Sequence, residues 1–441
     1  MEEAKTSGNM LTGLTRVMER ARKDPHGRML SLSHHIDVEA LRRAYVRTRK
    51  DAAVGVDGVT KEQYGQNLEE NLRDLHERLR TMKYRHQPLL RVHVPKDKGG
   101  TRPIGVSCLE DKIVQGAISE LLSAIYEQDF LDCSYGFRPG RRAHDALKAL
   151  LSAVKQGKAE VILESDVESF FDSIGRPMLK EMLQERIADK SLMRLIGKCL
   201  RVGVLDGEQL NMPEEGTAQG SALSPLLGNI YLHCALDVWF EREVKPRLKG
   251  ESTLIRYCDD FVMCFERMDD AQRVMGVLGK RLGRYKLRLA PDKTRLIDFR
   301  RPSSDKLSGK PSGSFDFLGF TLFWRRNVRS KGWHVSHKTR KGRLDRAIRR
   351  AYSYCRSHRH LPIPQQHAAL VRRIQGHFNY FGVSDNTSSL GSLTYAVIRA
   401  WFKWLNRRSQ KPSYNWEQFK DLLRDFPLPK ARVYVDLWNT P

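Results

Sequence analysis

Three aspartates have neighbours that suit metal chemistry. Asp166 follows the apolar run 161–163, and Asp259 and Asp260 lie between two short apolar segments. A carboxylate beside buried apolar residues is costly unless it binds a cation or accepts charge-assisted hydrogen bonds, and adjacent carboxylates repel one another. Two Mg²⁺ ions, which prefer oxygen ligands, would relieve that repulsion and support an in-line displacement at phosphorus. Asp is also a favoured turn residue, so the pair alone does not decide the matter.

The sequence around these aspartates predicts the strands that position them. Residues 160–166 are expected to form a buried strand that ends at Asp166. Residues 254–257 and 261–265 are expected to form two further strands that meet at a turn containing Asp259 and Asp260.

The rest of the N-terminal half is predicted to be helical, apart from a Gly-rich loop and a hairpin with basic residues at its tip. A polar stretch rich in Gly, Ser and Pro is expected to be a linker. Helices are expected at 1–50, 62–82 and 109–130, and again between Asp166 and about residue 203. The loop is expected at 54–60, the hairpin strands at 89–95 and 102–106, and the linker at 301–314.

Net charge is the strongest compositional signal. The 441 residues include 77 Lys and Arg against 52 Asp and Glu, a net charge of +25. Residues 321–441 alone hold 24 basic and six acidic residues, a net +18, together with six of the seven tryptophans. Such a charge favours a polyanionic partner, and basic residues interleaved with aromatics suit phosphate contact and base stacking. Each single tryptophan is better interpreted as a core residue.

Other classes of protein fit the sequence less well. No run approaches the roughly 18 apolar residues of a spanning helix, and the N-terminus lacks the pattern of a secretory signal. The seven cysteines are scattered and never spaced Cys-x-x-Cys, which argues against a zinc ribbon or a disulfide framework. We therefore expect a cytoplasmic protein with no membrane partner.

Several segments, taken together, resemble the bacterial group II intron reverse transcriptases, also called intron-encoded maturases. The similarity runs from about residue 50 to about residue 420, with the motifs in the order of that family. The segments include Tyr-Gly-Phe-Arg-Pro at 135–139, Tyr-Cys-Asp-Asp at 257–260 and Phe-Leu-Gly-Phe at 317–320, with further blocks at 54–58, Lys96 with 102–104, 166–172, 216–230 and 289–294.

The resemblance implies roles for individual residues. Asp166 and Asp259 would hold two Mg²⁺ ions, for which Mn²⁺ is a substitute, with Asp260 and Val167 completing the metal set. The deoxynucleoside triphosphate would be bound by Lys96, Arg102, Phe171, Gln219 and Gly220, of which Phe171 would exclude the ribose 2′-hydroxyl. Primer and template would be supported by Tyr257, Lys293 and Arg138, and RNA would be bound by Arg343, Arg346, Arg349 and Arg350.

Two features depart from the family pattern. Cys258 replaces the commoner Ala in the Tyr-Ala-Asp-Asp motif, from which we expect altered packing, a weak redox liability and no loss of metal binding. No paired Cys-x-x-Cys follows the last palm block, so the zinc-bearing endonuclease domain of many members is expected to be missing. Near the end of the chain, residues 376–382 are expected to form a turn between helices, and residues 414–429 a helix ended by prolines.

The resemblance implies an α+β fold shaped as a right hand. The expected parts are an N-terminal extension and fingers at 1–160, a palm at 161–325, a helical thumb (domain X) at 326–410 and a short DNA-binding-like tail at 411–441.

The function expected from this resemblance is RNA-directed DNA synthesis on a DNA primer, with intron RNA binding that assists splicing and mobility. A related reverse transcriptase in phage defence or DNA repair is one alternative, and an RNA-binding maturase without polymerase activity is another. The three aspartates argue against the latter. A palm-fold nucleotidyl cyclase also uses paired carboxylates but would not need a basic C-terminal domain.

Overall fold

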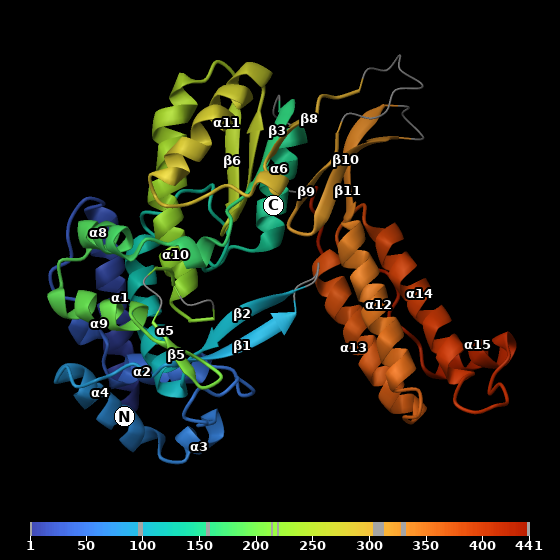
Figure 1. Ribbon diagram of the computed structural model, residues 1–441, viewed down its shortest axis with the longest axis horizontal. Helices are drawn as coiled ribbons and strands as arrows, with labels where there is room; N and C mark the ends of the chain where they lie inside the picture. Colours follow the sequence, from blue (N-terminus) through green and yellow to red (C-terminus); the bar gives the residue numbers. More distant parts are fainter. Residues whose placement is uncertain are drawn as a thin grey trace.

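The computed structural model describes residues 2–95, 100–155, 159–212, 215–217, 220–302, 313–327 and 332–438, with side chains from residue 13 onward. Lys96, Gln219 and most of the linker expected at 301–314 lie outside these ranges. In Figure 1 the N-terminal helices and the central strands form one broad mass, from which a bundle of C-terminal helices extends. The predicted α+β class is confirmed. None of the helices in the described ranges is both long and apolar enough to cross a membrane.

The N-terminal helices pack as a layer around one apolar helix. Its centre is α5, whose buried residues occupy most of its surface, and α1 and α2 pack against it. Side chains cap two of the helix starts, since Asp37 accepts from the Ala40 amide and Thr60 forms a capping box with Gln63. The predicted helices and the loop before α3 are confirmed. The helices are α1 (Glu2–Lys23), α2 (Val38–Arg47), α3 (Lys61–Gly65), α4 (Leu68–Arg80) and α5 (Leu109–Tyr126).

The predicted hairpin is confirmed as β1 (Leu89–Pro95) and β2 (Thr101–Val106), which pair antiparallel. The register places Arg102 opposite Val94, close to the end of the hairpin. Two short strands, β4 (Val204–Asp206) and β5 (Gln209–Asn211), extend this sheet in the order β2-β1-β4-β5.

The central sheet is antiparallel, with the order β6-β7-β3-β8. Alternate residues of its inner strands enter two different cores: Leu163 and Met263 face the core shared with the N-terminal helices, whereas Ile162 and Val262 face the core shared with the C-terminal bundle. Because both faces are covered, these strands are continuously apolar, which is the pattern that predicted them. The strands are β3 (Val161–Asp166), β6 (Ser252–Tyr257), β7 (Asp260–Phe265) and β8 (Arg295–Asp298).

A three-stranded sheet joins the central sheet to the helical bundle. Phe317 pairs with Phe320 across a two-residue turn in which Leu318 and Gly319 have φ of 48° and 81°. Positive φ at both turn residues is the pattern of a type I′ hairpin. Only one of the two turn residues here, Gly319, is a glycine. The strands are β9 (Phe315–Phe317), β10 (Phe320–Arg326) and β11 (Trp333–Thr339).

The C-terminal bundle has an aromatic core. Trp401 is fully buried, and its indole N–H donates to Gln366 at 3.0 Å. The expectation that single tryptophans are core residues is confirmed for Trp401 and Trp324, whereas Trp416 remains 43% exposed. The helices are α12 (Lys341–Ser357), α13 (Ile363–Phe381), α14 (Thr387–Leu405) and α15 (Trp416–Asp425).

One local prediction is wrong. Residues 376–381 were expected to form a turn, but they are the last part of α13, and only Gly382 lies at the helix end. Aromatic residues at 378 and 381 are buried on one helix face, and that packing outweighs the helix-breaking tendency of Gly376. The helix expected near the C-terminus is confirmed as α15, and its Phe419 is buried in the same core as Trp401.

The remaining elements connect these layers. They are α6 (Ala143–Lys155), α7 (Phe170–Ser173), α8 (Arg176–Arg186), α9 (Lys190–Leu200), α10 (Ser224–Leu232) with its π-helical continuation His233–Asp237 and Trp239–Val244, α11 (Met268–Gly283), and the 3₁₀ turns Ser33–His35, Lys245–Arg247 and Pro291–Lys293. The helices predicted between Asp166 and about residue 203 are thereby confirmed.

Candidate active site

The turn between β6 and β7 holds two of the three aspartates. Tyr257 pairs with Asp260, so Cys258 and Asp259 are the two loop residues. Of these two, only Cys258 has a positive φ, 59°, which is the φ pattern of a type II′ turn. A non-glycine residue in this conformation costs about 1–3 kcal/mol and persists only where surrounding structure holds it. Burial raises the pKa of the Cys258 thiol far above its usual range, so the thiol stays protonated.

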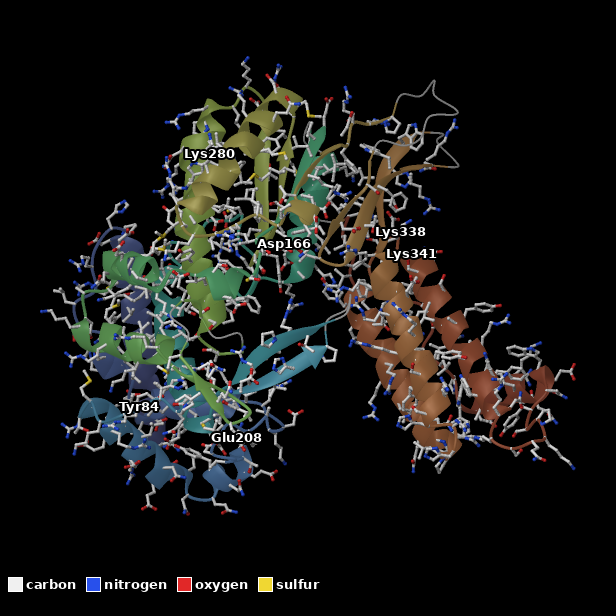
Figure 2. The ribbon with its side chains drawn as sticks, in the orientation of Figure 1. Tyr84, Asp166, Glu208, Lys280, Lys338 and Lys341 are labelled. Atoms are coloured by element: carbon white, nitrogen blue, oxygen red, sulfur yellow. The ribbon has the colours of Figure 1, made fainter. Side chains whose placement is uncertain are left out.

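The three aspartates converge at one end of the central sheet. Asp166 ends β3 and pairs with Asp260, which begins β7. Figure 2 shows Asp166 near the middle of the molecule, between the sheet and the β1–β2 hairpin. Burial, followed by repulsion from Asp166 and Asp259, raises the pKa of Asp260 to about 7. Burial also raises the pKa of Asp259, with repulsion from Asp166 adding to the rise and the Arg102 charge opposing it. This is the electrostatic condition that a bound cation relieves.

Contacts with residues 288–293 fix the position of Asp166. The Ala290 amide donates to the Asp166 backbone carbonyl at 2.9 Å, and Val167 forms a β-bridge with Leu289. The Lys293 ammonium forms an ion pair with the Asp166 carboxylate. Lys293, which was expected to support the primer end, therefore lies directly beside one of the three carboxylates.

A buried arginine to which the sequence analysis assigned no role holds the β6–β7 turn in place. Arg256 is fully buried and uses all five of its N–H groups. It donates to both carboxylate oxygens of Asp237 at 2.7 and 2.6 Å, to Asn229 Oδ1 at 2.9 Å, to Ser134 Oγ at 2.7 Å and to the Cys258 carbonyl at 3.0 Å. The bond to Cys258 restrains the strained residue of the turn. The sequence signal was an arginine inside an otherwise apolar strand.

Gly136 brings another predicted motif against the same turn. A Cβ atom at Gly136 would lie 2.5 Å from the Cys258 nitrogen, so only glycine permits this approach. The Gly136 carbonyl accepts a hydrogen bond from Asn229 Nδ2 at 2.7 Å, which ties the segment to the Arg256 network. Its neighbour Phe137 is 57% exposed, has a φ of 57°, and has its ring centroid 6.4 Å from that of Tyr257. Phe137 is therefore a further aromatic surface next to Tyr257.

The β9–β10 turn links the active site to the helical bundle. A hydrogen bond from the Leu318 backbone opposes the rise in the pKa of Asp260. The Leu318 carbonyl accepts a hydrogen bond from the Tyr380 hydroxyl of α13 at 2.8 Å. Tyr380 of α13 thus contacts Leu318, and Leu318 in turn contacts Asp260, so only one residue lies between the helix and this carboxylate. It was missed because residues 376–382 were interpreted as a turn.

Replacing Tyr380 with phenylalanine tests this connection. The variant removes one hydrogen bond to Leu318, which costs about 1 kcal/mol of stability. If the turn positions Asp260, we expect the nucleotide addition that the family resemblance implies to slow about 3- to 10-fold, corresponding to roughly 1 kcal/mol in the barrier. Tyr352→Phe, which removes an exposed hydroxyl paired with Lys403, is the control and is expected to retain the wild-type rate. An unchanged rate in Tyr380→Phe would show that the bond is only structural.

Three of the residues expected to bind nucleotide lie together. A Cβ at Gly220, which has a φ of 111°, would meet the Gly105 carbonyl oxygen at 2.6 Å, so Gly220 lies against β2, the strand that carries Arg102. Phe171 borders the same segment, because its carbonyl accepts from the Thr217 amide at 2.7 Å. Its ring lies 3.3 Å from the position of a Cβ on Gly228 of α10. Lys96 and Gln219 lie outside the described residues.

Arg138 does not join this group. Its guanidinium is buried and donates to Glu127 at 3.0 Å and to the carbonyls of Leu131 and Ser134 at 2.7 and 2.9 Å. These contacts stabilise the loop that carries Gly136. The expected role of Arg138 in primer and template support stays a prediction, and it would act through that loop.

The four arginines expected to bind RNA all lie on α12. Arg349 and Arg350 are exposed, whereas Arg346 is half-buried. Arg343 is exposed near the β9–β10 turn. Burial raises the pKa of the Tyr380 hydroxyl, and the Arg343 charge opposes that rise. The helix therefore presents positive charge from the edge of the active site outward along the bundle.

The residues present fit magnesium. Across the part of the chain that the structure describes, no three His, Cys, Asp or Glu side chains form a complete metal cage. Mg²⁺ is usually bound by one or two carboxylates, several waters and substrate phosphates, not by a cage of protein ligands alone. The three aspartates supply only oxygen donors, and the pKa of Asp260 is raised first by burial and then by repulsion from Asp166 and Asp259. Their chemistry matches that of a cation completed by substrate.

Comparison with known proteins gives a consistent result. Residues 94–322 match the family model described as reverse transcriptase (RNA-dependent DNA polymerase). The chain is 32% identical over 277 residues to protein YkfC of Escherichia coli (strain K12), a match that covers 55% of this chain and 71% of that protein. It is 33% identical over 215 residues to the group II intron-encoded protein LtrA of Lactococcus lactis subsp. cremoris, covering 47% of this chain and 36% of LtrA. It is also 37% identical over 163 residues to an uncharacterized 91 kDa protein in the cob intron of Schizosaccharomyces pombe, covering 37% and 20% of the two chains.

Proposed function

This chain belongs to the reverse transcriptase family, and from that premise we propose that it is an RNA-directed DNA polymerase that adds deoxynucleotides to a DNA primer. The observation that carries the proposal is the convergence of Asp166, Asp259 and Asp260 at one end of the central sheet. An enzyme of this class needs little covalent chemistry from the protein, because positioning and electrostatic stabilisation do most of the work.

We assign the metal site to Asp166 and Asp259, with Asp260 and Val167 completing the set. Two Mg²⁺ ions, for which Mn²⁺ is a substitute, would activate the primer 3′-hydroxyl and stabilise the departing pyrophosphate. Asp260, whose pKa burial and the neighbouring carboxylates raise to about 7, would carry its full negative charge once a cation is bound, and a hydrogen bond from the Leu318 backbone already favours its charged form. Lys293 holds Asp166 in place through its ion pair.

We assign the nucleotide pocket to the surface between β2, the segment at Gly220 and Phe171. Arg102, and with it Lys96, would bind the triphosphate, for which guanidinium and ammonium groups are suited. Gly220 permits the close approach of backbone to β2, and Gln219 would line the pocket beside it.

Phe171 gives a prediction about sugar selectivity. Phe171 is half-buried, with its ring against Gly228 of α10 and its carbonyl bound to the Thr217 amide, and there the ring would block a 2′-hydroxyl. Phe171→Ala should therefore admit ribonucleotides, lowering the preference for deoxynucleotides at least about 10-fold, or about 1.4 kcal/mol. The measurement is kcat/KM for matched ribo- and deoxynucleotides in single-nucleotide addition. A preference that stays unchanged would remove Phe171 from the sugar site.

The domain assignment follows the same reasoning. We propose fingers at 1–160, palm at 161–325, thumb at 326–410 and a tail at 411–441. The packing of Phe402 against Trp416, with ring centroids 4.1 Å apart, makes the start of the tail part of the thumb's aromatic core. Any DNA-binding role of the tail would therefore act from a surface fixed to the thumb.

A second role is favoured by the charge of the C-terminal region and by the similarity to a group II intron-encoded protein. We propose that residues 326–410, with Arg343, Arg346, Arg349 and Arg350, bind intron RNA in the bacterial cytoplasm and support its splicing and mobility. The partners would then be intron RNA, an RNA template and a DNA primer or target. A reverse transcriptase serving phage defence or DNA repair would share the polymerase site and differ in its RNA.

Primer extension tests the proposal. Purified protein is given an annealed DNA primer on an RNA template, the four deoxynucleotides and Mg²⁺, with EDTA, a DNA template and ribonucleotides as parallel arms. Extension that needs Mg²⁺ and prefers deoxynucleotides on RNA is the expected result. Tight binding to structured intron RNA without any extension would instead favour a maturase that lacks polymerase activity.

A further inference from the structure

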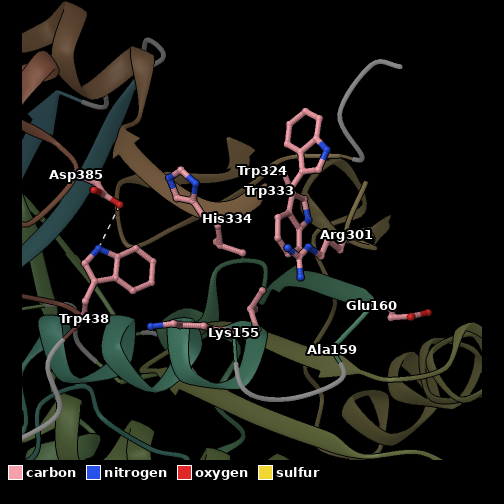
Figure 3. Close-up of a pocket in the computed structure, with 11 residues that line it drawn as sticks. Lys155, Ala159, Glu160, Arg301, Trp324, Trp333, His334, Asp385 and Trp438 are labelled. Carbon is pink, nitrogen blue, oxygen red and sulfur yellow. Dashed lines mark hydrogen bonds between the residues drawn. The ribbon is translucent and has the colours of Figure 1, made fainter. Parts of the chain in front are cut away.

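A pocket on the side of the molecule away from the three aspartates has the composition of a nucleotide-binding site. It is a cavity of about 530 Å³ between α6, the start of β3 and strands β10 and β11 (Figure 3). This volume lies in the range of small-ligand sites. The six residues of interest among those lining it are Lys155, Arg301, Trp324, Trp333, Asp385 and Trp438.

Three indole rings form the apolar part of this pocket. Trp324 is fixed, since it is 9% exposed and its N–H donates to the Phe299 carbonyl at 2.8 Å. Trp333 and Trp438 are only half-buried, so part of each ring remains open to a ligand. The Trp438 N–H donates to Asp385 Oδ2 at 3.2 Å, and this bond is visible in Figure 3. The partly open indole of Trp333 is suited to stacking with a planar base, whereas the Trp438 ring already has Lys155 at 5.3 Å and the His337 ring at 5.8 Å.

Two cations border the indoles. Lys155 ends α6 and lies 5.3 Å from the centroid of the Trp438 ring. Lys155 and Arg301 are both exposed, and neither has a carboxylate partner among the described residues. The lining also holds two carboxylates: Asp385 accepts from the Trp438 N–H inside the pocket, and Glu160 precedes β3. The two exposed cations thus give the pocket rim local points for phosphate contact, whereas the four charged side chains of the lining sum to zero.

The pocket is separate from the proposed polymerase site. Ala159 and Glu160 precede β3, and Asp166 ends it, so the six residues of the strand separate the two sites by about 20 Å. The Lys155–Trp438 contact places the last described residue of the chain beside the end of α6.

We propose that this pocket binds an unpaired nucleotide of a single-stranded nucleic acid, with the base on Trp333 and the adjoining phosphates at Lys155 and Arg301. Base stacking and phosphate contact are the two interactions by which proteins hold single strands, and the pocket supplies both. The inference rests on the proposed function only in taking nucleic acid as the ligand. It adds a second binding site to a chain whose polymerase site lies elsewhere.

Binding of a labelled six-nucleotide RNA to the full-length protein tests this proposal. An excess of unlabelled primer–template duplex first occupies the polymerase site, and the affinity for the RNA is then followed by fluorescence anisotropy. We expect Trp333→Ala to weaken binding about 10-fold, and Lys155→Gln with Arg301→Gln to weaken it and lower the salt dependence by about one unit of slope. Lys280→Gln, which removes an exposed cation of α11 outside the pocket, is the matched control and should bind as wild type.

A second measurement locates the contact and defines the ligand. The same RNA carrying 4-thiouridine should cross-link to the peptides that contain Trp333 or Trp438, and a single-stranded DNA of the same sequence should compete for it. The proposal is overturned if the pocket variants bind as wild type, if cross-links map only to the polymerase site, or if free ADP competes as well as the oligonucleotide. Primer extension by Trp333→Ala on a short template should equal wild type, so a failure of the polymerase proposal would be seen separately.

Discussion

We expect primer extension to fall at least about 1000-fold when Asp259 is replaced by alanine. Asp259 occupies the tip of the β6–β7 turn, where it is half-buried and its carboxylate is repelled by that of Asp166. A divalent cation held there contributes several kcal/mol of charge stabilisation in the transition state, and each 1.4 kcal/mol is worth about tenfold in rate. The measurement is single-nucleotide addition under saturating primer–template, with the burst amplitude reported beside the rate.

The matched control for this variant is Asp269→Ala. Asp269 lies at the start of α11, and its exposed carboxylate pairs with Arg267. It lies outside the β6–β7 turn that holds Asp259. Asp269→Ala removes the same charge as Asp259→Ala but leaves the candidate site unchanged, so we expect full activity. Binding of intron RNA should be kept by both variants, since the RNA contacts are assigned to α12. Extension by Asp259→Ala within tenfold of wild type would place the chemistry on other residues.

Replacing Arg256 with lysine should lower kcat about 10- to 100-fold while leaving KM for the deoxynucleotide nearly unchanged. Lysine keeps the charge opposite Asp237 but offers three donors from one atom in place of the five of a planar fork. It cannot reach Asp237, Asn229, Ser134 and the Cys258 carbonyl together. A catalytic turn displaced by as little as about 1 Å can cost on the order of 100-fold in rate.

The control for this prediction is a second buried arginine. Arg186 is 6% exposed, pairs with Asp129 at 2.8 Å and donates to backbone carbonyls in the N-terminal layer, away from the turn. Arg186→Lys should lose stability to a similar extent, yet keep its kcat at temperatures below the melting transition of both variants. If both variants lose kcat equally, Arg256 acts through general stability and not through the position of the turn.

Local elements were predictable where the burial pattern alone determines them. The end of β3 at Asp166 and the meeting of β6 and β7 at Asp259 follow from apolar runs closed by polar residues, and the structure has these boundaries. The proximity of Gly220 to β2 was not predictable, because it depends on packing between segments more than 100 residues apart in the sequence.

Contacts that join distant segments escaped sequence reasoning for the same reason. Arg256 was visible as a charge within an apolar strand, but its partners at 134, 229 and 237 come from three other parts of the chain. Tyr380 was hidden by the glycines on either side of it, which suggested a turn, although tertiary packing of Phe378 and Phe381 keeps the helix intact. The local sequence pattern predicts the three carboxylates, whereas the residues that hold them in place are seen only in the folded structure.

The central strands bind the two halves of the molecule into one cooperative unit. Leu163 and Met263 complete the interior of the N-terminal half, while Ile162 and Val262, one position along, complete that of the C-terminal half. Neither half can melt without leaving an apolar face of the sheet in water, a loss that scales with the area uncovered. Deleting the thumb would therefore yield an insoluble remnant in place of a smaller working polymerase, and thermal inactivation should coincide with global unfolding.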